Sequence, residues 1–317
     1  MRRGYNPGLL GLTPRLGKTI NWQDPQLQGL EAWFPLVEGG GAIIRDESRV
    51  ARQGTFQSPA WIHDGVVGAA VPDFNGTTGK IDVSFYVPPI GTAPRTITAW
   101  IAPDVTGLYG TIAAWGATAT GQKWVFRTDG AANTLRVEIS GSGFTGTLAW
   151  TPATWTFVAV TFQGTTLAGH TLFVGDQSEA ATGANSVNTA STNGLAIGHN
   201  VVDNSQWFDG RIRDLRIYHR ALTAAELQII RTQPFRPFIL RGLEAGAPAP
   251  DPADEEALAW LTGNQAWNPA LPVGGTGALS EADRQHLLHG LRDPIWRSTG
   301  GSLIAQQMAW YDAGMGV

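Results

Sequence analysis

The segment from Gln206 to Ile230, QWFDGRIRDLRIYHRALTAAELQII, constrains the fold of this chain more than any other. Asp209-Gly210 predicts a tight turn, because glycine adopts the positive φ that such turns need. Apolar and basic residues then alternate, with one slip before Leu215, which predicts a strand with one buried face and one basic, solvated face. The basic residues of that face are Arg211, Arg213 and Arg216.

A short helix is predicted directly after this strand. Thr223 stands three residues before Glu226, which is the capping-box spacing at which a helix begins. Leu222, Leu227 and Ile230 give this helix an apolar side that needs a partner surface. The segment is therefore expected to run from turn to strand to capped helix.

Strand signals recur through most of the preceding chain. Its 40 glycines, 13 tryptophans and 15% charged residues suit many short strands joined by turns. Turn residues recur about every 8–15 positions, so we predict a mainly β fold built as an antiparallel sandwich. The predicted strand segments are Leu30–Leu36, Phe74–Val83, Arg95–Pro103, Thr111–Ala117, Lys123–Gly130, Thr134–Ser140, Trp155–Gly164, His170–Asp176 and Gly194–Asn200.

Charge and hydropathy exclude several classes of partner. The net charge of −4 gives no electrostatic basis for binding nucleic acid. No run of about 18 apolar residues is present, so we expect no membrane insertion. The chain has no cysteine, and its basic N-terminus lacks the apolar core of a secretory signal. We therefore expect synthesis in a host cytoplasm and stability without disulfides.

Composition divides the chain into four parts. Residues 1–28 predict an extended N-terminal arm, 29–232 the sandwich, 233–250 a Pro/Ala/Gly linker, and 251–317 a module of short helices. The arm is basic and rich in proline and glycine, so it is either a disordered tail or an arm that docks on a neighbouring subunit. Its candidate assembly contacts are Arg2, Arg3, Tyr5, Leu9, Leu10, Leu12 and Trp22.

The sequence resembles the laminin-G-like, concanavalin-A-like jelly-roll domains of phage and bacterial surface proteins. The matching segments are GLEAWFPL, FNGTTGKIDV, TITAWIAP, WTFVAVTFQG, HTLFVGD, LAIGHN and FDGRIRDLRIYHRALTAAEL, which occur in the family's order over residues 29–232. The lead-in at Ile20–Leu36 is similar to that of such domains in phage virion proteins. The resemblance implies a jelly roll that binds or supports other molecules more often than it catalyses a reaction.

Tryptophans supply the candidates for sugar stacking. Trp33, Trp100 and Trp155 lie within alternating strands and are expected in the core. Three others lie near strand ends or loops, where an exposed ring can stack on the C–H face of a sugar, although packing or an interface explains them as well. These candidate glycan-binding residues are Trp115, Trp124 and Trp207.

A calcium site and a glycosidase site were also considered. Asp203, Asn204 and Asp209 supply oxygen ligands around one loop, as calcium prefers, and are the candidate calcium ligands. No segment has the Glu-x-Asp-x-x-Glu pattern of the β-glucanases, whose reaction needs paired carboxylates. We therefore expect no enzyme and no required cofactor.

These observations predict a non-enzymatic structural protein of a phage-like virion. It would be a capsid-decoration, spike or tail-associated subunit, oligomeric within the particle and anchored through its termini to a major capsid or tail protein. Arg211, Arg213 and Arg216 are either a solvated strand face or contacts to an acidic partner. The alternatives are a carbohydrate-binding module for host attachment and, less favoured, a glycoside hydrolase.

Overall fold

A computed structural model describes residues 20–238 of the chain, apart from positions 84, 108 and 131. The chain divides into two compact units, Met1–Phe238 and Ile239–Val317. The predicted contacts at Arg2, Arg3, Tyr5, Leu9, Leu10 and Leu12 lie outside the described residues, as do most of the predicted linker and all of the C-terminal module. Among the described residues, no helix has the length and hydrophobicity to span a membrane.

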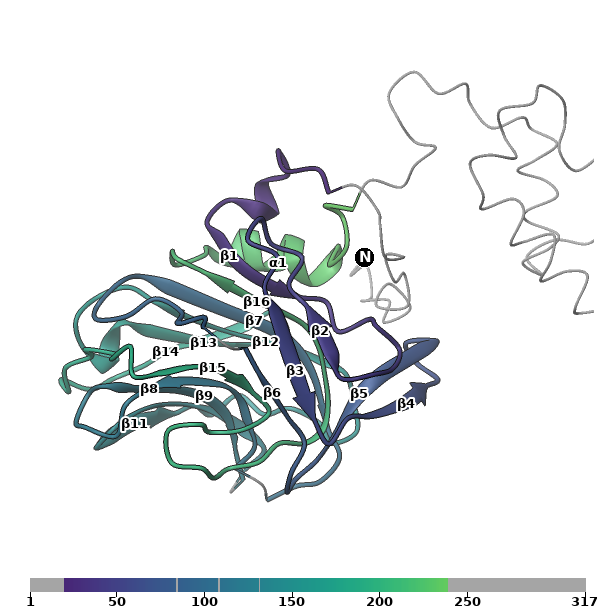
Figure 1. Cartoon of the computed structure of the whole chain (residues 1–317). Helices are drawn as coiled ribbons and strands as arrows, with labels where there is room; N and C mark the ends of the chain where they lie inside the picture. Colours follow the sequence, from purple (N-terminus) through teal and green to yellow (C-terminus); the bar gives the residue numbers. More distant parts are fainter. Residues whose placement is uncertain (1–19, 84, 108, 131, 239–317) are drawn as a thin grey trace, which may run out of the picture. The chain divides into compact units, whose positions relative to one another are not determined.

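Two antiparallel sheets pack face to face, so the predicted mainly β sandwich is confirmed (Figure 1). The first sheet has the order β14-β13-β12-β7-β16-β5-β4, and β1 also pairs with β16. Its strands are β1 (Leu30–Phe34), β4 (Ala60–Asp64), β5 (Ala69–Asn75), β7 (Arg95–Pro103), β12 (Thr156–Phe162), β13 (His170–Val174), β14 (Gln177–Ala180) and β16 (Asp209–Tyr218).

The second sheet has the order β11-β10-β9-β8-β15-β6-β3-β2. Its strands are β2 (Ile43–Arg45), β3 (Gln53–Gln57), β6 (Lys80–Asp82), β8 (Thr111–Gly116), β9 (Lys123–Asp129), β10 (Thr134–Ile139), β11 (Ser142–Thr145) and β15 (Asn193–Ile197). Two short 3-10 turns, η2 (Pro25–Leu27) and η3 (Leu167–Gly169), and one helix, α1 (Ala224–Thr232), are the remaining elements described.

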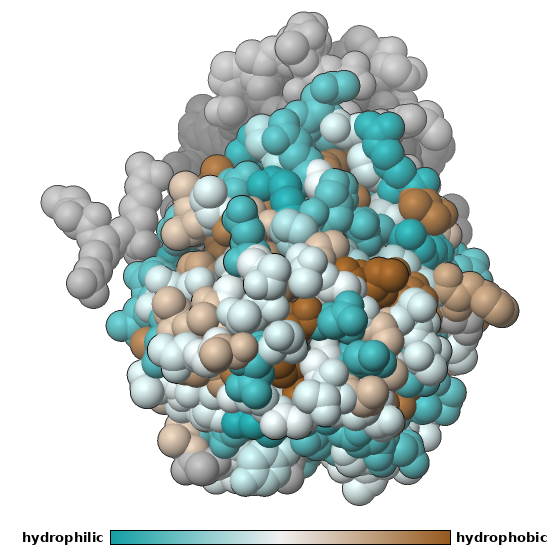
Figure 2. All heavy atoms as spheres, turned by 90° about the vertical axis from the view of Figure 1, so that its left-hand side faces the viewer, coloured by the Kyte–Doolittle hydropathy of each residue, from teal (hydrophilic) through white to brown (hydrophobic). Residues whose placement is uncertain are grey.

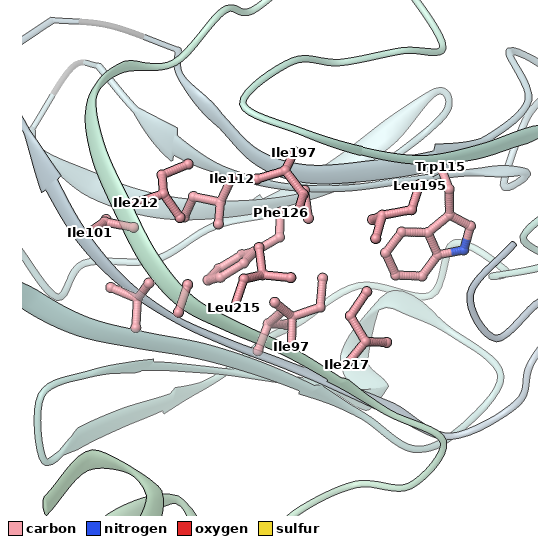
Figure 3. Close-up of a cluster of buried hydrophobic side chains, with 14 of the residues drawn as sticks. Ile97, Ile101, Ile112, Trp115, Phe126, Leu195, Ile197, Ile212, Leu215 and Ile217 are labelled. Atoms are coloured by element: carbon pink, nitrogen blue, oxygen red, sulfur yellow. The ribbon is translucent and has the colours of Figure 1, made fainter. Parts of the chain in front are cut away.

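The main core lies between the two sheets (Figure 3). Alternate residues of the central strands point inward and are fully shielded from solvent. In the close-up, side chains of the first sheet face those of the second: Ile97, Ile101, Ile212, Leu215 and Ile217 against Ile112, Trp115, Phe126, Leu195 and Ile197.

A second apolar cluster lies on the outer face of the first sheet, beneath α1. Leu227 and Ile230 of α1 share this cluster with Trp100 and Trp155, which confirms the buried position predicted for these tryptophans. The predicted capping box is present, because Thr223 Oγ1 accepts from Glu226 N and Glu226 Oε2 accepts from Thr223 N. The capped helix therefore covers a sheet face that would otherwise meet solvent.

The slip before Leu215 is a β-bulge in β16. Asp214 has a φ of 49°, and the pairing of β16 with β7 shifts between Arg213 and Arg216. The bulge also marks a change of neighbour on the other side of the strand, where Asp209–Arg211 pair with β5 and Leu215–Tyr218 pair with β1. One strand thus holds together three neighbours because it bends at Asp214.

A buried ion pair fills the bulge. Asp214 Oδ1 accepts from Trp33 Nε1 at 2.6 Å and from Arg216 Nε at 3.0 Å. The Arg216 guanidinium lies 4.2 Å from the Trp33 ring centroid and also donates to Gln26 Oε1 and to the carbonyl of Pro234. The pair joins β1, the turn before it and the segment after α1 to a single strand.

The prediction of a basic, solvated face on this strand is therefore wrong at Arg213 and Arg216. Both side chains are fully buried, because residues from β1 and the chain around Phe235 cover them. The predicted turn at Asp209-Gly210 is also wrong, since both residues begin β16. Glycine is required at position 210 because β16 and β7 approach closely there, and a Cβ would lie 2.4 Å from the carbonyl oxygen of Ala102.

The end of the predicted arm and the start of the predicted linker pack together on the sandwich. Ile20 forms an isolated bridge with Phe238, and Asn21 N donates to the carbonyl of Pro237 at 2.7 Å. Phe238 packs against the buried Trp33, with ring centroids 4.8 Å apart. Residues 20–28 and 233–238 thus belong to the sandwich rather than to extensions from it.

Replacing Asp214 with Asn tests how much the buried ion pair contributes to the stability of the fold. Asn tolerates the left-handed backbone and keeps the shape, but it leaves the Arg216 charge buried without its counterion. We expect unfolding to become easier by about 3–5 kcal/mol, measured by urea denaturation. Asp176→Asn, at an exposed turn, is the control and should change stability by less than about 0.5 kcal/mol. Equal stability of the two variants would contradict the assigned role.

Candidate functional site

The outer face of the second sheet carries a cluster of paired charges. Lys123 Nζ lies 2.6 Å from Glu138 Oε1, and Arg127 Nε donates to Glu138 Oε2 at 3.1 Å. Burial acts to raise the pKa of Glu138, but the hydrogen bond and charge of Lys123, with those of Arg127, outweigh it and hold that pKa below its ordinary value. Glu138 therefore stays ionised and acts as a fixed hydrogen-bond acceptor.

A hairpin from residue 198 to 208 is anchored beside this cluster. Asn200 and Ser205 exchange backbone hydrogen bonds across it, and Gln206 O accepts from Thr111 N at 2.8 Å. Asp203, near its tip, forms an ion pair with Lys123. Although burial opposes its charge, Lys123 has a raised pKa because it bonds to both Asp203 and Glu138. The ammonium thus ties the hairpin to the face of the sheet.

Two aromatic rings beside the charge cluster remain accessible to solvent. Trp207 is half-buried and packs on His199, with ring centroids 4.1 Å apart. Tyr109 is 51% exposed, and the Arg127 guanidinium lies 5.0 Å from its ring centroid. We call the set of Lys123, Arg127, Glu138, Asp203, Tyr109 and Trp207 the polar face. Lys123 and Arg127 are themselves buried, so the exposed surface of this set comes from the two rings and the carboxylates of Glu138 and Asp203.

Trp115 and Trp124 cannot share the role predicted for Trp207. Neither indole has exposed surface, and their ring centroids lie 4.5 Å apart within the core. Trp124 Nε1 donates to His170 Nε2 at 2.9 Å, so its polar atom is satisfied inside the protein. The expectation of glycan stacking at these two residues is corrected, because both side chains point between the sheets.

The three predicted calcium ligands have separate partners. Asp203 binds Lys123 and Asn200, while Asn204 Oδ1 lies 3.0 Å from His199 Nε2. Asp209 belongs to β16 and pairs with Asn75 across the strands. Within residues 20–238, leaving aside the omitted positions, no three His, Asp or Glu side chains are grouped to hold a metal.

The arginines predicted as assembly contacts are internal or already paired. Arg213 and Arg216 are buried under the segments described above. Arg211 lies 2.8 Å from Asp64 and 2.7 Å from Asp104, which join β16 to two neighbouring segments. Trp22 packs at the edge of the cluster around Trp33, with the Arg49 guanidinium 4.8 Å from its ring centroid.

The sequence held a signal for the polar face that its analysis did not use. In β9, KWVFRTD, Trp124 and Phe126 alternate with Lys123, Val125 and Arg127, so the period of two places the cations on one face. Glu138 falls on the same face because it lies opposite Val125. The contribution of Tyr109 is set by the loop around it and has no comparable pattern.

An open cavity of about 590 Å³ lies apart from these charges, beside β1. Residues of β1, of the β2–β3 connection and of the β6–β7 connection line it. The side of the sandwich that carries the edge strands β11 and β14 shows only small hydrophobic groups among neutral and hydrophilic residues in Figure 2. The polar face and this cavity are therefore the two places considered for ligands.

Residues 75–228 match the family model described as the concanavalin A-like lectin/glucanases superfamily. A comparison with curated proteins gave no match. Among solved structures, domain 4 of AbnA, a GH43 extracellular arabinanase from Geobacillus stearothermophilus solved with arabinotriose, is 17% identical. The similarity covers 64% of this chain and 98% of that domain, with a TM-score of 0.50.

Two further solved structures are more distant. A Trypanosoma rangeli sialidase mutant displaying trans-sialidase activity is 15% identical, with a TM-score of 0.49, over 65% of this chain and 33% of the sialidase. The binding domain of botulinum neurotoxin serotype D/C is 13% identical, with a TM-score of 0.46, over 64% of this chain and 52% of that one. At these identities the likeness concerns the fold.

The burial of His170 makes stability depend on pH. Burial, with a smaller contribution from the charge of Arg95, lowers the pKa of His170 from 6.5 to about 4. Between pH 6.5 and 4 His170 is protonated in the unfolded chain but neutral in the folded chain. The free energy of unfolding therefore falls as the pH drops through this range, by about 3 kcal/mol in total. Urea midpoints measured across this range should show the loss in the natural chain and a smaller loss in His170→Gln. The exposed-site variant His63→Gln should follow the natural chain; identical pH dependence in all three would refute this assignment.

Proposed function

We propose that the sandwich, in which residues 75–228 match the model of the concanavalin A-like lectin/glucanases superfamily, is a non-catalytic carbohydrate-binding domain. The observation that carries the proposal is the polar face. Tyr109 presents an exposed ring against Arg127, and the half-buried Trp207 lies in the hairpin that Lys123 holds through Asp203. The charges of Lys123, Arg127 and Glu138 are paired with one another. The expected ligand is an oligosaccharide that lies against the outer face of the second sheet.

The chemistry of a sugar ring suits this arrangement. One side of a pyranose presents C–H groups that pack on an aromatic ring, while its hydroxyls need directed partners. Hydrogen bonds to ionised groups are roughly twice as strong as neutral ones. Because Lys123 already holds Asp203 and Glu138 in place, little side-chain freedom remains to be lost on binding.

The same face supports binding rather than hydrolysis. A glycosidase needs a carboxylic acid that keeps its proton near neutral pH, so the pKa of that acid must be raised. Glu138 has a lowered pKa, which is the opposite tuning. The carboxylate of Asp203 lies near that of Glu138, because both contact Lys123 Nζ, at 2.5 and 2.6 Å, and the ammonium rather than a substrate lies between them.

The virion role predicted from the sequence remains a second proposal. Its motive is the similarity of Ile20–Leu36 to virion proteins and the presence of long segments on both sides of the sandwich. It would be compatible with sugar binding, because a particle subunit can carry an outward-facing adhesion domain. Density-gradient fractionation of the native source tests the virion role: co-migration with particles at fixed stoichiometry supports it, and free protein alone opposes it.

The carbohydrate proposal is tested by screening neutral oligosaccharides for binding to the full chain, followed by calorimetry on those that bind. Trp207→Ala should remove one aromatic contact that contributes about 1.5 kcal/mol, and so should weaken binding about tenfold. A similar loss of affinity is expected in Tyr109→Ala. Val66→Ala is the control, because Val66 is an exposed apolar residue outside both the polar face and the cavity. Unchanged affinity in both polar-face variants, or no neutral oligosaccharide bound, would reject the proposal.

A further inference from the structure

The cavity beside β1 has the features of a second binding site. Its volume of about 590 Å³ falls within the range of small-ligand pockets. Three segments that are distant in sequence meet there: β1 at Leu30 and Glu31, the β2–β3 connection at Arg49 and Arg52, and the β6–β7 connection at Phe85–Val87. A pocket built by three segments gives its lining residues a defined geometry.

The position of Phe85 in this pocket is not explained by a role in folding. Its side chain is fully exposed, at 106% of the reference area, so it contributes nothing to the core. Its φ of 60° is also a conformation that costs a phenylalanine free energy. The next residue but one, Val87, is 37% exposed, and Val50 across the pocket is 61% exposed. An exposed aromatic ring on a strained backbone at the rim of a pocket indicates a contact with a bound molecule.

The inner wall of the pocket is polar and held in place. Glu31 Oε2 accepts from the hydroxyl of Tyr86 at 3.1 Å, and the Glu31 side chain remains 30% exposed. Arg52 stacks on the Tyr86 ring at 4.0 Å and donates to Asp46 Oδ2 and to the carbonyl of Glu31. Glu31 is thus a positioned, partly exposed acceptor, with Oε2 bonded to Tyr86 and Oε1 3.7 Å from His219 Nδ1.

Arg49 supplies a cation at the pocket rim. Its exposed guanidinium lies over the Trp22 ring, which restrains the side chain while leaving its N–H groups available. Among the described residues, no carboxylate lies within ion-pair distance of Arg49, whereas Arg52 has Asp46. A guanidinium in this position is suited to a carboxylate on an incoming molecule.

We propose that this pocket binds an acidic sugar, a pyranose that carries a carboxylate. Phe85 would pack against the C–H face of the ring, Glu31 would accept from ring hydroxyls, and Arg49 would bind the carboxylate. An apolar acid would use Phe85 and Arg49 but would offer no hydroxyl to the exposed part of Glu31. The site is separate from the polar face, so this proposal does not rest on the proposed function.

The test is calorimetric titration of the full chain with trigalacturonate and with its fully methyl-esterified form, which keeps the rings and removes the charges. We expect trigalacturonate to bind and the ester to bind at least tenfold more weakly. Phe85→Gly and Arg49→Gln should each lose at least tenfold in affinity, while Trp207→Ala should keep the affinity of the natural chain.

Folding is checked in the same variants. Phe85→Gly should unfold at an equal or higher urea concentration than the natural chain, since glycine adopts a φ of 60° without strain. A loss of binding in a variant that folds as well or better separates recognition from stability. The proposal is overturned if trigalacturonate does not bind, if the ester binds equally, if phenylacetate competes as well as trigalacturonate, or if both pocket variants bind normally.

Discussion

The carboxylate of Asp214 sits in the bulge of β16 and joins parts of the chain that are almost 200 residues apart in sequence. Through Arg216 it reaches Gln26 and Pro234, and directly it binds the indole of Trp33. A buried charge is costly unless it is paired and hydrogen-bonded, so these segments must be in place for the strand to keep its shape. The ends of the described chain are thereby fixed to the strand that also borders β7.

The two outer faces of the sandwich are covered in different ways. On the first sheet, α1 covers the cluster around Trp100, and residues 20–28 and 233–238 cover Trp33. On the second sheet, the outer face carries paired charges and the hairpin 198–208 instead of an apolar cover. Packing therefore occupies one face, and recognition is proposed for the other.

The sequence predicted the sandwich well because alternation and turn residues report local geometry. The capping box at Thr223 and the slip before Leu215 correspond to a real cap and a real bulge. The short strands β2, β3, β4, β11 and β14 were missed, since they carry few β-branched residues in alternation and depend on a neighbour for their pairing.

Which face of a strand is buried depends on what covers it, and the sequence of the strand does not contain that information. Arg213 and Arg216 looked solvated because no pattern shows that Trp33 and Phe235 fold over them. Trp115 and Trp124 looked accessible because they stand near strand ends, yet both point between the sheets. Trp207 is half-buried, and the contact between Tyr109 and Arg127 joins separate segments that only the fold brings together.

The outer face of the second sheet is proposed as the recognition surface for neutral sugars. Hydrogen exchange of the full chain, with and without a bound neutral oligosaccharide, tests it most directly. The account predicts slower amide exchange in β9 and in the hairpin 198–208, with no change in β16. Protection confined to α1 and β1, with none in the hairpin, would contradict it.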